Sequence, residues 1–232
     1  MSQPIICFDL DGTLVDTAPD LMDSLNHSLG AGGAPLADAL SFRRFVGHGA
    51  RAMIERAYEA GRKPLGSEEH DRLFALFLDH YGSNIPGRSR PYPGVLDALD
   101  RFRAAGYVLA VCTNKTEAFS KKLIHSLGMA HLFAAICGQD SFAFRKPDPR
   151  HLTETIALAG GDPGRALMVG DSATDIDTAK AAGIPVVAVD FGYTDRHVRD
   201  FEPSKIISHF DELTVELAER LMATAVETVS HC

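Results

Sequence analysis

The sequence predicts an α/β protein with a doubly wound parallel sheet and an inserted all-helical cap. Over most of the chain, short apolar runs alternate with amphipathic helical patterns, which is typical of a parallel sheet covered by helices. Residues 17–90 break this alternation, because they hold several helical patterns in succession and no convincing strand. We therefore expect an α/β core formed by residues 1–16 and 91–232, and a helical cap domain formed by residues 17–90.

Four apolar runs are expected to form strands of a Rossmann-like sheet: residues 5–8, 107–112, 166–169 and 185–189. Amphipathic segments predict helices over residues 95–105, 117–127, 149–159 and 173–182. A glycine follows each of these helices, where a left-handed residue commonly ends a helix: Gly106, Gly128, Gly160 and Gly183. Residues 86–94 are rich in turn formers and are expected to return the chain from the cap, and residues 211–226 predict a last helix.

The composition is that of an ordinary globular protein, with 45% apolar and 23% charged residues in a chain of 232. A formal net charge of −8 argues against nucleic acid as a partner but leaves a small phosphorylated metabolite open, since a few local cations can offset it. The four cysteines form no Cys-x-x-Cys pair, which indicates a reducing compartment. With no signal peptide or membrane span expected, the prediction is a cytoplasmic protein, monomeric or homodimeric.

Two aspartates follow the first predicted strand in the segment Asp-Leu-Asp-Gly-Thr, residues 9–13. Ligands of open parallel sheets bind beyond the carboxyl ends of the strands, where Asp9 and Asp11 are expected to emerge. Gly12 allows the backbone to turn sharply around a ligand. A simple turn is the alternative, since Asp and Gly are common turn formers.

Three further segments carry polar residues at the ends of strands or the starts of helices. Asp171 and Asp175 follow the run 166–169. Thr113 and Asn114 follow the run 107–112, and such groups at a helix N-terminus suit a phosphate. Lys146 precedes Pro-Asp-Pro, a stiff loop that can hold its charge toward a phosphate. Taken one at a time, helix capping explains the acids, the threonine and the asparagine, and a lone lysine is usually solvated.

Coincidence becomes the weaker explanation because most of these segments lie at one predicted edge of the sheet. Two carboxylates about 4 Å apart repel by roughly 4 kcal/mol at an effective dielectric constant of about 20. Asp9, Asp11 and Asp171 in one cleft therefore call for a cation. Ligation by oxygen alone suits Mg²⁺, which keeps several waters and also holds a substrate phosphate.

With these segments in this order, the sequence resembles the haloacid dehalogenase superfamily, whose four motifs match residues 9–13, 113–114, 146–147 and 170–175. The resemblance covers nearly the whole chain, the cap included. Residues 45–50, 91–95, 113–115 and 191–193 are most similar to the branch that acts on 2-phosphoglycolate. The resemblance implies a magnesium-dependent phosphatase that converts 2-phosphoglycolate to glycolate and phosphate.

The same resemblance implies roles for the site residues. Asp9 would be the nucleophile that forms an aspartyl-phosphate, and Asp11 the general acid and base. Magnesium is expected on Asp9, on the backbone carbonyl of Asp11 and on Asp171, with Asp175 in support. Lys146 is expected to be catalytic by stabilising the charge of the transition state.

Substrate contacts are expected from both parts of the chain. Thr113, Asn114 and Lys146 would hold the transferring phosphoryl group. The cap residues expected to contact the leaving group are Gly47, His48, Gly49 and Arg51, with Arg51 able to pair with a substrate carboxylate. Ordinary entry into a helix is the alternative explanation of these cap residues.

Other functions remain open at this point. A sugar-phosphate mutase of the same superfamily would return the phosphoryl group to the substrate, and another phosphatase would act on a different small substrate such as pyrophosphate. A non-catalytic phosphate-binding protein would not need Asp9 and Asp11. Dehalogenation is disfavoured, because the branches that attack carbon lack the second aspartate.

Overall fold

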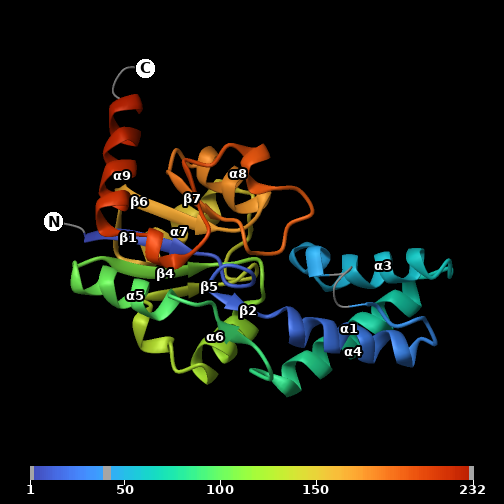
Figure 1. The fold of residues 1–232 in the computed structure, drawn as a ribbon. Coiled ribbons are helices and arrows are strands. Elements are labelled where there is room, and N and C mark those ends of the chain that lie inside the picture. The colour runs from blue at the N-terminus through green and yellow to red at the C-terminus, as the bar shows by residue number, and fades with distance from the viewer. Residues whose placement is uncertain (1–2, 39–42, 230–232) are drawn as a thin grey trace.

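The computed structural model describes residues 3–38 and 43–229, and its main sheet has six strands in the order β5-β4-β1-β6-β7-β8 (Figure 1). All neighbouring strands in this sheet pair in parallel. Their bounds are β1 Gln3–Phe8, β4 Val108–Cys112, β5 Ala135–Cys137, β6 Gly161–Gly170, β7 Val186–Val189 and β8 Lys205–Ile207. Counted in chain order within the sheet, the arrangement is 3-2-1-4-5-6, which confirms the predicted doubly wound fold.

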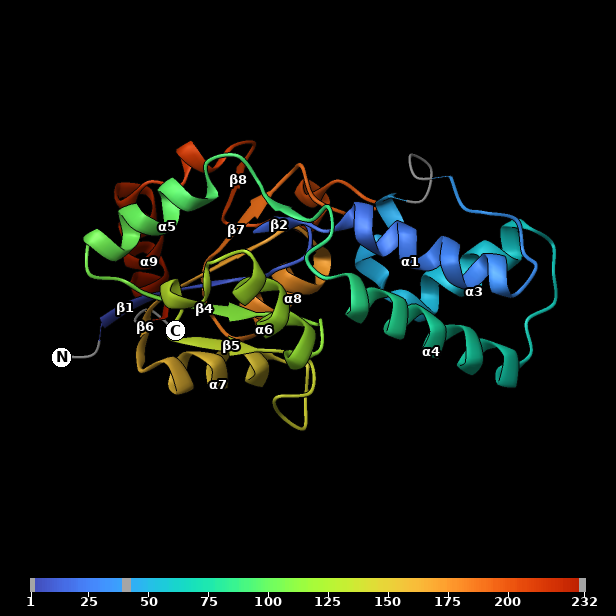
Figure 2. The same cartoon turned by 90° about the horizontal axis from the view of Figure 1, so that it is seen from below.

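The central strand β1 separates two apolar cores. Ile6 and Phe8 belong to the core that includes residues of α5 (Val95–Ala104), α6 (Glu117–Ser126) and α9 (Val215–Val229). Ile5 and Cys7 belong to the core under α7 (Pro149–Ala159) and α8 (Ala173–Ala181). Figure 2 shows α5 and α9 on one side of the sheet and α7 on the other. Burial on both faces makes such a strand a continuous apolar run, the signal by which it is recognised in the sequence.

The predicted strands correspond to β1, β4, β6 and β7, and the predicted helices to α5, α6, α7 and α8. The edge strands β5 and β8 lie outside the predicted set, because three residues are too few to form a recognisable run. The four glycines expected to end helices all have positive φ, between 67° and 83°. The last helix begins at Val215 rather than 211, because Phe210–Glu212 form a separate 3₁₀ turn, η4, capped by His209. Two further 3₁₀ turns are η2 (Ala130–Leu132) and η3 (Val198–Phe201).

Within the described residues, the segment between β2 and β3 contains helices and no strand. Its elements are α1 (Ala18–Ala31), η1 (Arg43–His48), α3 (Ala50–Ala60) and α4 (Ser67–Asn84), here called the helical unit. The unit has an apolar core of its own, centred on residues such as Leu25, Tyr58 and Phe77. It lies beyond the carboxyl ends of the sheet strands (Figures 1 and 2). Its extent as a cap domain over residues 17–90 stays a prediction.

Two short antiparallel strands, β2 (Val15–Asp16) and β3 (Arg90–Pro91), carry the chain into and out of the helical unit. Next to them, the buried carboxylate of Asp20 accepts hydrogen bonds from the backbone N–H groups of Arg88 (2.7 Å) and Ser89 (2.8 Å) and from the Ser89 hydroxyl (2.5 Å). These bonds tie the outgoing and returning segments together. None of the helices in the described part of the chain meets the length and hydropathy of a bilayer-spanning segment.

Candidate active site

The acidic residues of the site emerge where two neighbouring strands end. Asp9 follows β1, and its backbone N–H donates to the carbonyl oxygen of Val169 on β6 at 2.9 Å. Asp171 follows β6 directly. Strand order reverses between β1 and β6, and open sheets bind ligands in the crevice at such a point. The structure thus brings Asp9 and Asp171 to one edge of the sheet, as the sequence predicts.

Three buried carboxylates meet at this edge. Asp9, Asp171 and Asp175 each place an oxygen within 4.8 Å of the others, and their exposed fractions are 8%, 2% and 0%. The side chain of Asp11 is not in this group, since both of its carboxylate oxygens pair with Lys115. A ligand role for Asp11 therefore rests on its backbone carbonyl, as the family resemblance implies, and stays a prediction.

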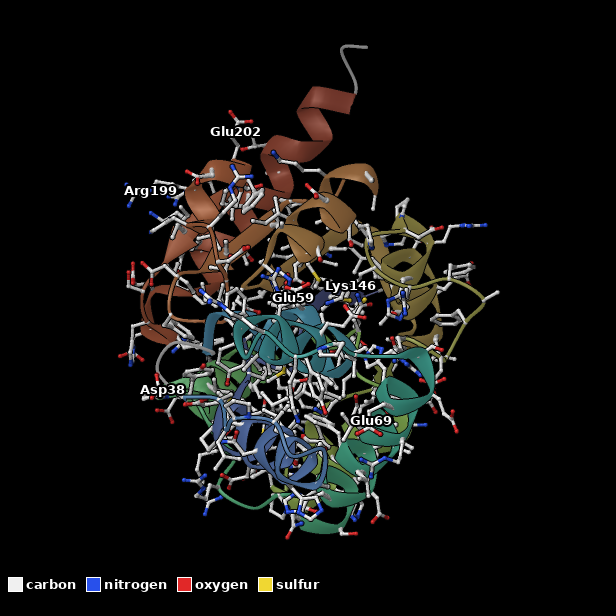
Figure 3. The ribbon with its side chains drawn as sticks, turned by 90° about the vertical axis from the view of Figure 1, so that its right-hand side faces the viewer. Asp38, Glu59, Glu69, Lys146, Arg199 and Glu202 are labelled. Atoms are coloured by element: carbon white, nitrogen blue, oxygen red, sulfur yellow. The ribbon has the colours of Figure 1, made fainter. Side chains whose placement is uncertain are left out.

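Lys146 reaches into the cluster from the loop before α7. Its Nζ lies 3.0 Å from Oδ1 of Asp9 and 2.5 Å from Oδ1 of Asp175. The Asn114 side-chain amide holds this loop in place by donating to the Lys146 carbonyl oxygen at 2.9 Å. Figure 3, seen from the side of the helical unit, shows Lys146 near the centre of the molecule, whereas Arg199 and Glu202 lie at the periphery. Lys146 is thus buried and bonded to Asp9, whereas a lysine judged by itself in the sequence would be expected to be solvated.

The cluster carries more negative charge than its one lysine balances. Burial raises the pKa of Asp9 to about 6, against the opposing effect of Lys146. Burial, with Asp9 and Asp175 nearby, also raises the pKa of Asp171 well above its ordinary value. Burial alone would lower the pKa of Lys146, but Asp175 and Asp9 outweigh it and raise that pKa. Carboxylates with raised pKa values are groups that a bound cation would stabilise in the charged form.

These donors fit a hard divalent cation such as Mg²⁺, because all of them are carboxylate oxygens in a buried, electronegative site. Asp175 accepts more of the described hydrogen bonds than Asp9 or Asp171 does. Its Oδ1 accepts from Lys146, and its Oδ2 accepts from the backbone N–H groups of Asp171 and Ser172 and from the Ser172 hydroxyl. Asp9 and Asp171 are therefore better placed to hold the ion, and Asp175 to hold Lys146 and the start of α8.

Contacts from two other segments fix the carboxylate of Asp171. The Thr13 hydroxyl donates to its Oδ1 at 2.9 Å, and the backbone N–H of Tyr193 donates to its Oδ2 at 2.6 Å. A Cβ on Gly12 would lie 2.4 Å from Oδ2 of Asp171, and one on Gly192 would lie 2.3 Å from it. The sequence gives no role to Thr13 or Tyr193, although both lie in segments that carry the family resemblance.

Thr113 and Asn114 follow β4, the other neighbour of β1. Thr113 is 2% exposed, and its Oγ1 accepts from the backbone N–H of Lys115 at 3.2 Å. That bond forms a local turn before α6, whose N-cap is Thr116, so Thr113 does not cap the helix. Contact of Thr113 and Asn114 with a phosphoryl group stays a prediction.

The four cap candidates, Gly47, His48, Gly49 and Arg51, lie in η1 and at the start of α3, where Gly49 is the N-cap residue. Gly47 packs so closely that an added Cβ would lie 2.7 Å from the Tyr193 carbonyl oxygen, and His48 Nε2 lies 3.8 Å from a carboxylate oxygen of Asp195. Arg51 instead pairs with Asp71 at 2.8 Å, with about half of its side chain exposed. Gly47 and His48 therefore contact the sheet domain near the site, whereas Arg51 is engaged within the helical unit. Their roles toward a substrate stay predictions.

The comparisons with known proteins agree with one another. The family model of the haloacid dehalogenase-like hydrolases matches residues 6–189. A protein named phosphoglycolate phosphatase from Mesorhizobium japonicum is 73% identical over 97% of this chain and 99% of its own length. One of the same name from Agrobacterium fabrum is 48% identical over 95% of this chain and 94% of its own. The crystal structure of a predicted phosphoglycolate phosphatase from Haemophilus somnus, 33% identical, superposes with a TM-score of 0.84 over 92% of this chain and 97% of that one.

Proposed function

Because the chain belongs to the haloacid dehalogenase-like hydrolases, we propose that it is a magnesium-dependent phosphatase whose substrate is 2-phosphoglycolate. The observation that carries the proposal is the buried Asp9 carboxylate, held at the switch point of the sheet among Lys146, Asp171 and Asp175. The relatives named above support the choice of substrate. The products would be glycolate and inorganic phosphate.

Asp9 attacks phosphorus in line, and the bond from phosphorus to the glycolate oxygen breaks as the bond to Asp9 forms. Asp11 gives a proton to the departing oxygen and later takes one from the water that hydrolyses the aspartyl-phosphate. Lys146, 3.0 Å from Asp9, supplies positive charge beside the phosphoryl oxygens. Asp9, Asp171 and the carbonyl of Asp11 would hold Mg²⁺, which when bound offsets charge on Asp9 and on the phosphoryl group.

Thr113 and Asn114 complete the phosphoryl site from the end of β4, where hydroxyl and amide groups can donate to its oxygens. We further propose that residues 17–90 form a cap that closes over the crevice and excludes water. The position of the helical unit beyond the carboxyl ends of the strands supports this role (Figure 1).

The test of the function is a screen of phosphorylated metabolites, scored by released inorganic phosphate and ranked by kcat/KM. The expected result is Mg²⁺-dependent phosphate release with 2-phosphoglycolate ranked first. A clear preference for another monoester or for pyrophosphate would reject the substrate. Phosphoryl transfer between sugar positions without phosphate release would point to a mutase instead.

A glycine substitution tests how tightly Asp171 must be held. Gly12→Ala places a Cβ 2.4 Å from Oδ2 of Asp171, at a residue whose φ is 86°. We expect weaker Mg²⁺ binding in calorimetry and a loss of phosphatase activity on the order of 100-fold, the effect of misplacing a catalytic group by about 1 Å.

Gly106→Ala is the matched control, because Gly106 has a similar φ of 83° and no atom within 4 Å of an added Cβ. Both variants carry the backbone strain of a non-glycine residue at positive φ, about 1–3 kcal/mol. Only Gly12→Ala should lose metal affinity. Equal Mg²⁺ affinity in the two variants would show that Asp171 tolerates the displacement.

A further inference from the structure

Two buried lysines pair with different acids of the site. Lys146 forms ion pairs with Asp9 and Asp175, as described above. Lys115, whose side chain is 6% exposed, lies 3.1 Å and 3.0 Å from the two carboxylate oxygens of Asp11. The family motifs account for Lys146, whereas no role described so far requires Lys115.

The pairing with Asp11 relates Lys115 to the leaving group of the proposed reaction. In the proposed reaction Asp11 acts on the ester oxygen that departs, so a cation bonded to Asp11 lies close to that oxygen and to the atoms attached to it. An ammonium group has three N–H donors. Asp11 can accept at most two of them through its two carboxylate oxygens, so at least one remains for the neighbouring Tyr81 hydroxyl or for a ligand.

The helical unit covers Lys115 with a tyrosine. The ring of Tyr81, on α4, has its centroid 4.4 Å from Nζ of Lys115. Tyr81 is 2% exposed, yet its hydroxyl has no hydrogen-bond partner among the described residues. A buried hydroxyl without a partner is uncommon in a folded protein and indicates a group that is met by something other than the chain itself. Burial raises the pKa of Tyr81, while the charge of Lys115 lowers it and that of Asp11 raises it, so the hydroxyl lies near the same acid and amine.

We propose, on the basis of the phosphatase function argued above, that Lys115 and the Tyr81 hydroxyl bind a carboxylate on the leaving group. In a 2-phospho-carboxylate this group is attached to the carbon that bears the ester oxygen, so it lies within reach of a cation bonded to Asp11. The substrate class is therefore phosphomonoesters with a carboxylate on that carbon. Lys115 is the specificity-determining residue, and Arg51, engaged by Asp71 on the surface, is not.

The experiment compares Lys115→Met with the unmodified protein on two monoesters, 2-phosphoglycolate and ethyl phosphate. Ethyl phosphate keeps the phosphoryl group and the two-carbon chain but lacks the carboxylate. The readout is the ratio of the two kcat/KM values, because any general damage to Asp11 or to the fold affects both substrates and cancels. We expect the ratio to fall by about 10- to 100-fold in Lys115→Met, the effect of losing a charged hydrogen bond.

Two further variants sharpen the result. Tyr81→Phe removes an unpartnered hydroxyl and leaves the Lys115–Asp11 pair intact, and we expect it to lower the ratio by about 2- to 10-fold. Lys121→Met is the control, since Lys121 is an exposed lysine of the following helix that pairs only with Glu117 in the described contacts, and its ratio should not change.

The outcomes separate this inference from the proposed function. If the unmodified protein hydrolyses neither monoester, the proposed function fails. If it prefers 2-phosphoglycolate and Lys115→Met keeps that preference, the function stands and the inference is overturned. If Arg51→Gln loses the preference for 2-phosphoglycolate and Lys115→Met keeps it, the substrate carboxylate binds Arg51 and the inference is overturned.

Discussion

Replacing Asp9 with asparagine is expected to abolish phosphatase activity, with kcat lowered by at least about 10⁴-fold. The side-chain amide cannot form the covalent phosphoryl intermediate, although it can occupy the same position beside Lys146. The fold should stay intact, because the substitution removes one of three mutually repelling buried carboxylates. Released phosphate measures the activity, and the Tm together with circular dichroism measures the fold.

Asp190→Asn is the matched control for this prediction. Asp190 follows β7, the strand next to β6, but it is exposed and accepts a hydrogen bond from the Ser208 hydroxyl at 2.7 Å. Asp190→Asn makes the same chemical change at the end of a strand outside the acidic cluster, so it should leave kcat/KM unchanged. Near-normal turnover in Asp9→Asn would overturn the assignment of the nucleophile.

Removal of divalent cations is expected to eliminate activity, and Mg²⁺ is expected to restore it. The reason is the excess negative charge of Asp9, Asp171 and Asp175, which Lys146 alone does not balance. Since the ion binds the folded protein, Mg²⁺ should also raise the Tm. Asp171→Asn should weaken Mg²⁺ binding in calorimetry by about 10- to 100-fold or more, because loss of a group that only supports a metal ligand already costs that much.

The Tm provides a check on the metal that is independent of catalysis. In the unmodified protein it should rise with Mg²⁺ concentration, and in Asp171→Asn the rise should need far more Mg²⁺. Activity that survives exhaustive chelation would show that the acidic cluster does not serve a metal.

The doubly wound parallel sheet could be predicted from the sequence because its four central strands are continuous apolar runs that alternate with helical patterns. That logic also places Asp9 and Asp171 together, since the carboxyl ends of parallel strands meet at one edge. The strands β5 and β8 could not be predicted in this way, because three residues are too few to form a recognisable apolar run. These are edge strands, and their absence from the prediction does not move the site.

The charge pairing inside the site could not be predicted from the sequence. Lys115 stands beside Thr113 and Asn114 in the chain, but its burial depends on α4 packing over it, a contact between segments that are distant in sequence. The same holds for Tyr193, which reaches Asp171 through its backbone N–H and Asp16 through its hydroxyl. Arg51 pairs with Asp71, a contact that the sequence pattern does not indicate, and its role toward a substrate carboxylate stays a prediction.

The most direct test of the account is the identity of the residue that carries the phosphoryl group during turnover. The protein is mixed with 2-phosphoglycolate and Mg²⁺, quenched in acid within one turnover, digested, and analysed by peptide mass spectrometry. We predict the added mass of one phosphoryl group on Asp9 and its absence in Asp9→Asn. A phosphoryl group found on any other residue, with phosphate still released, would contradict the account.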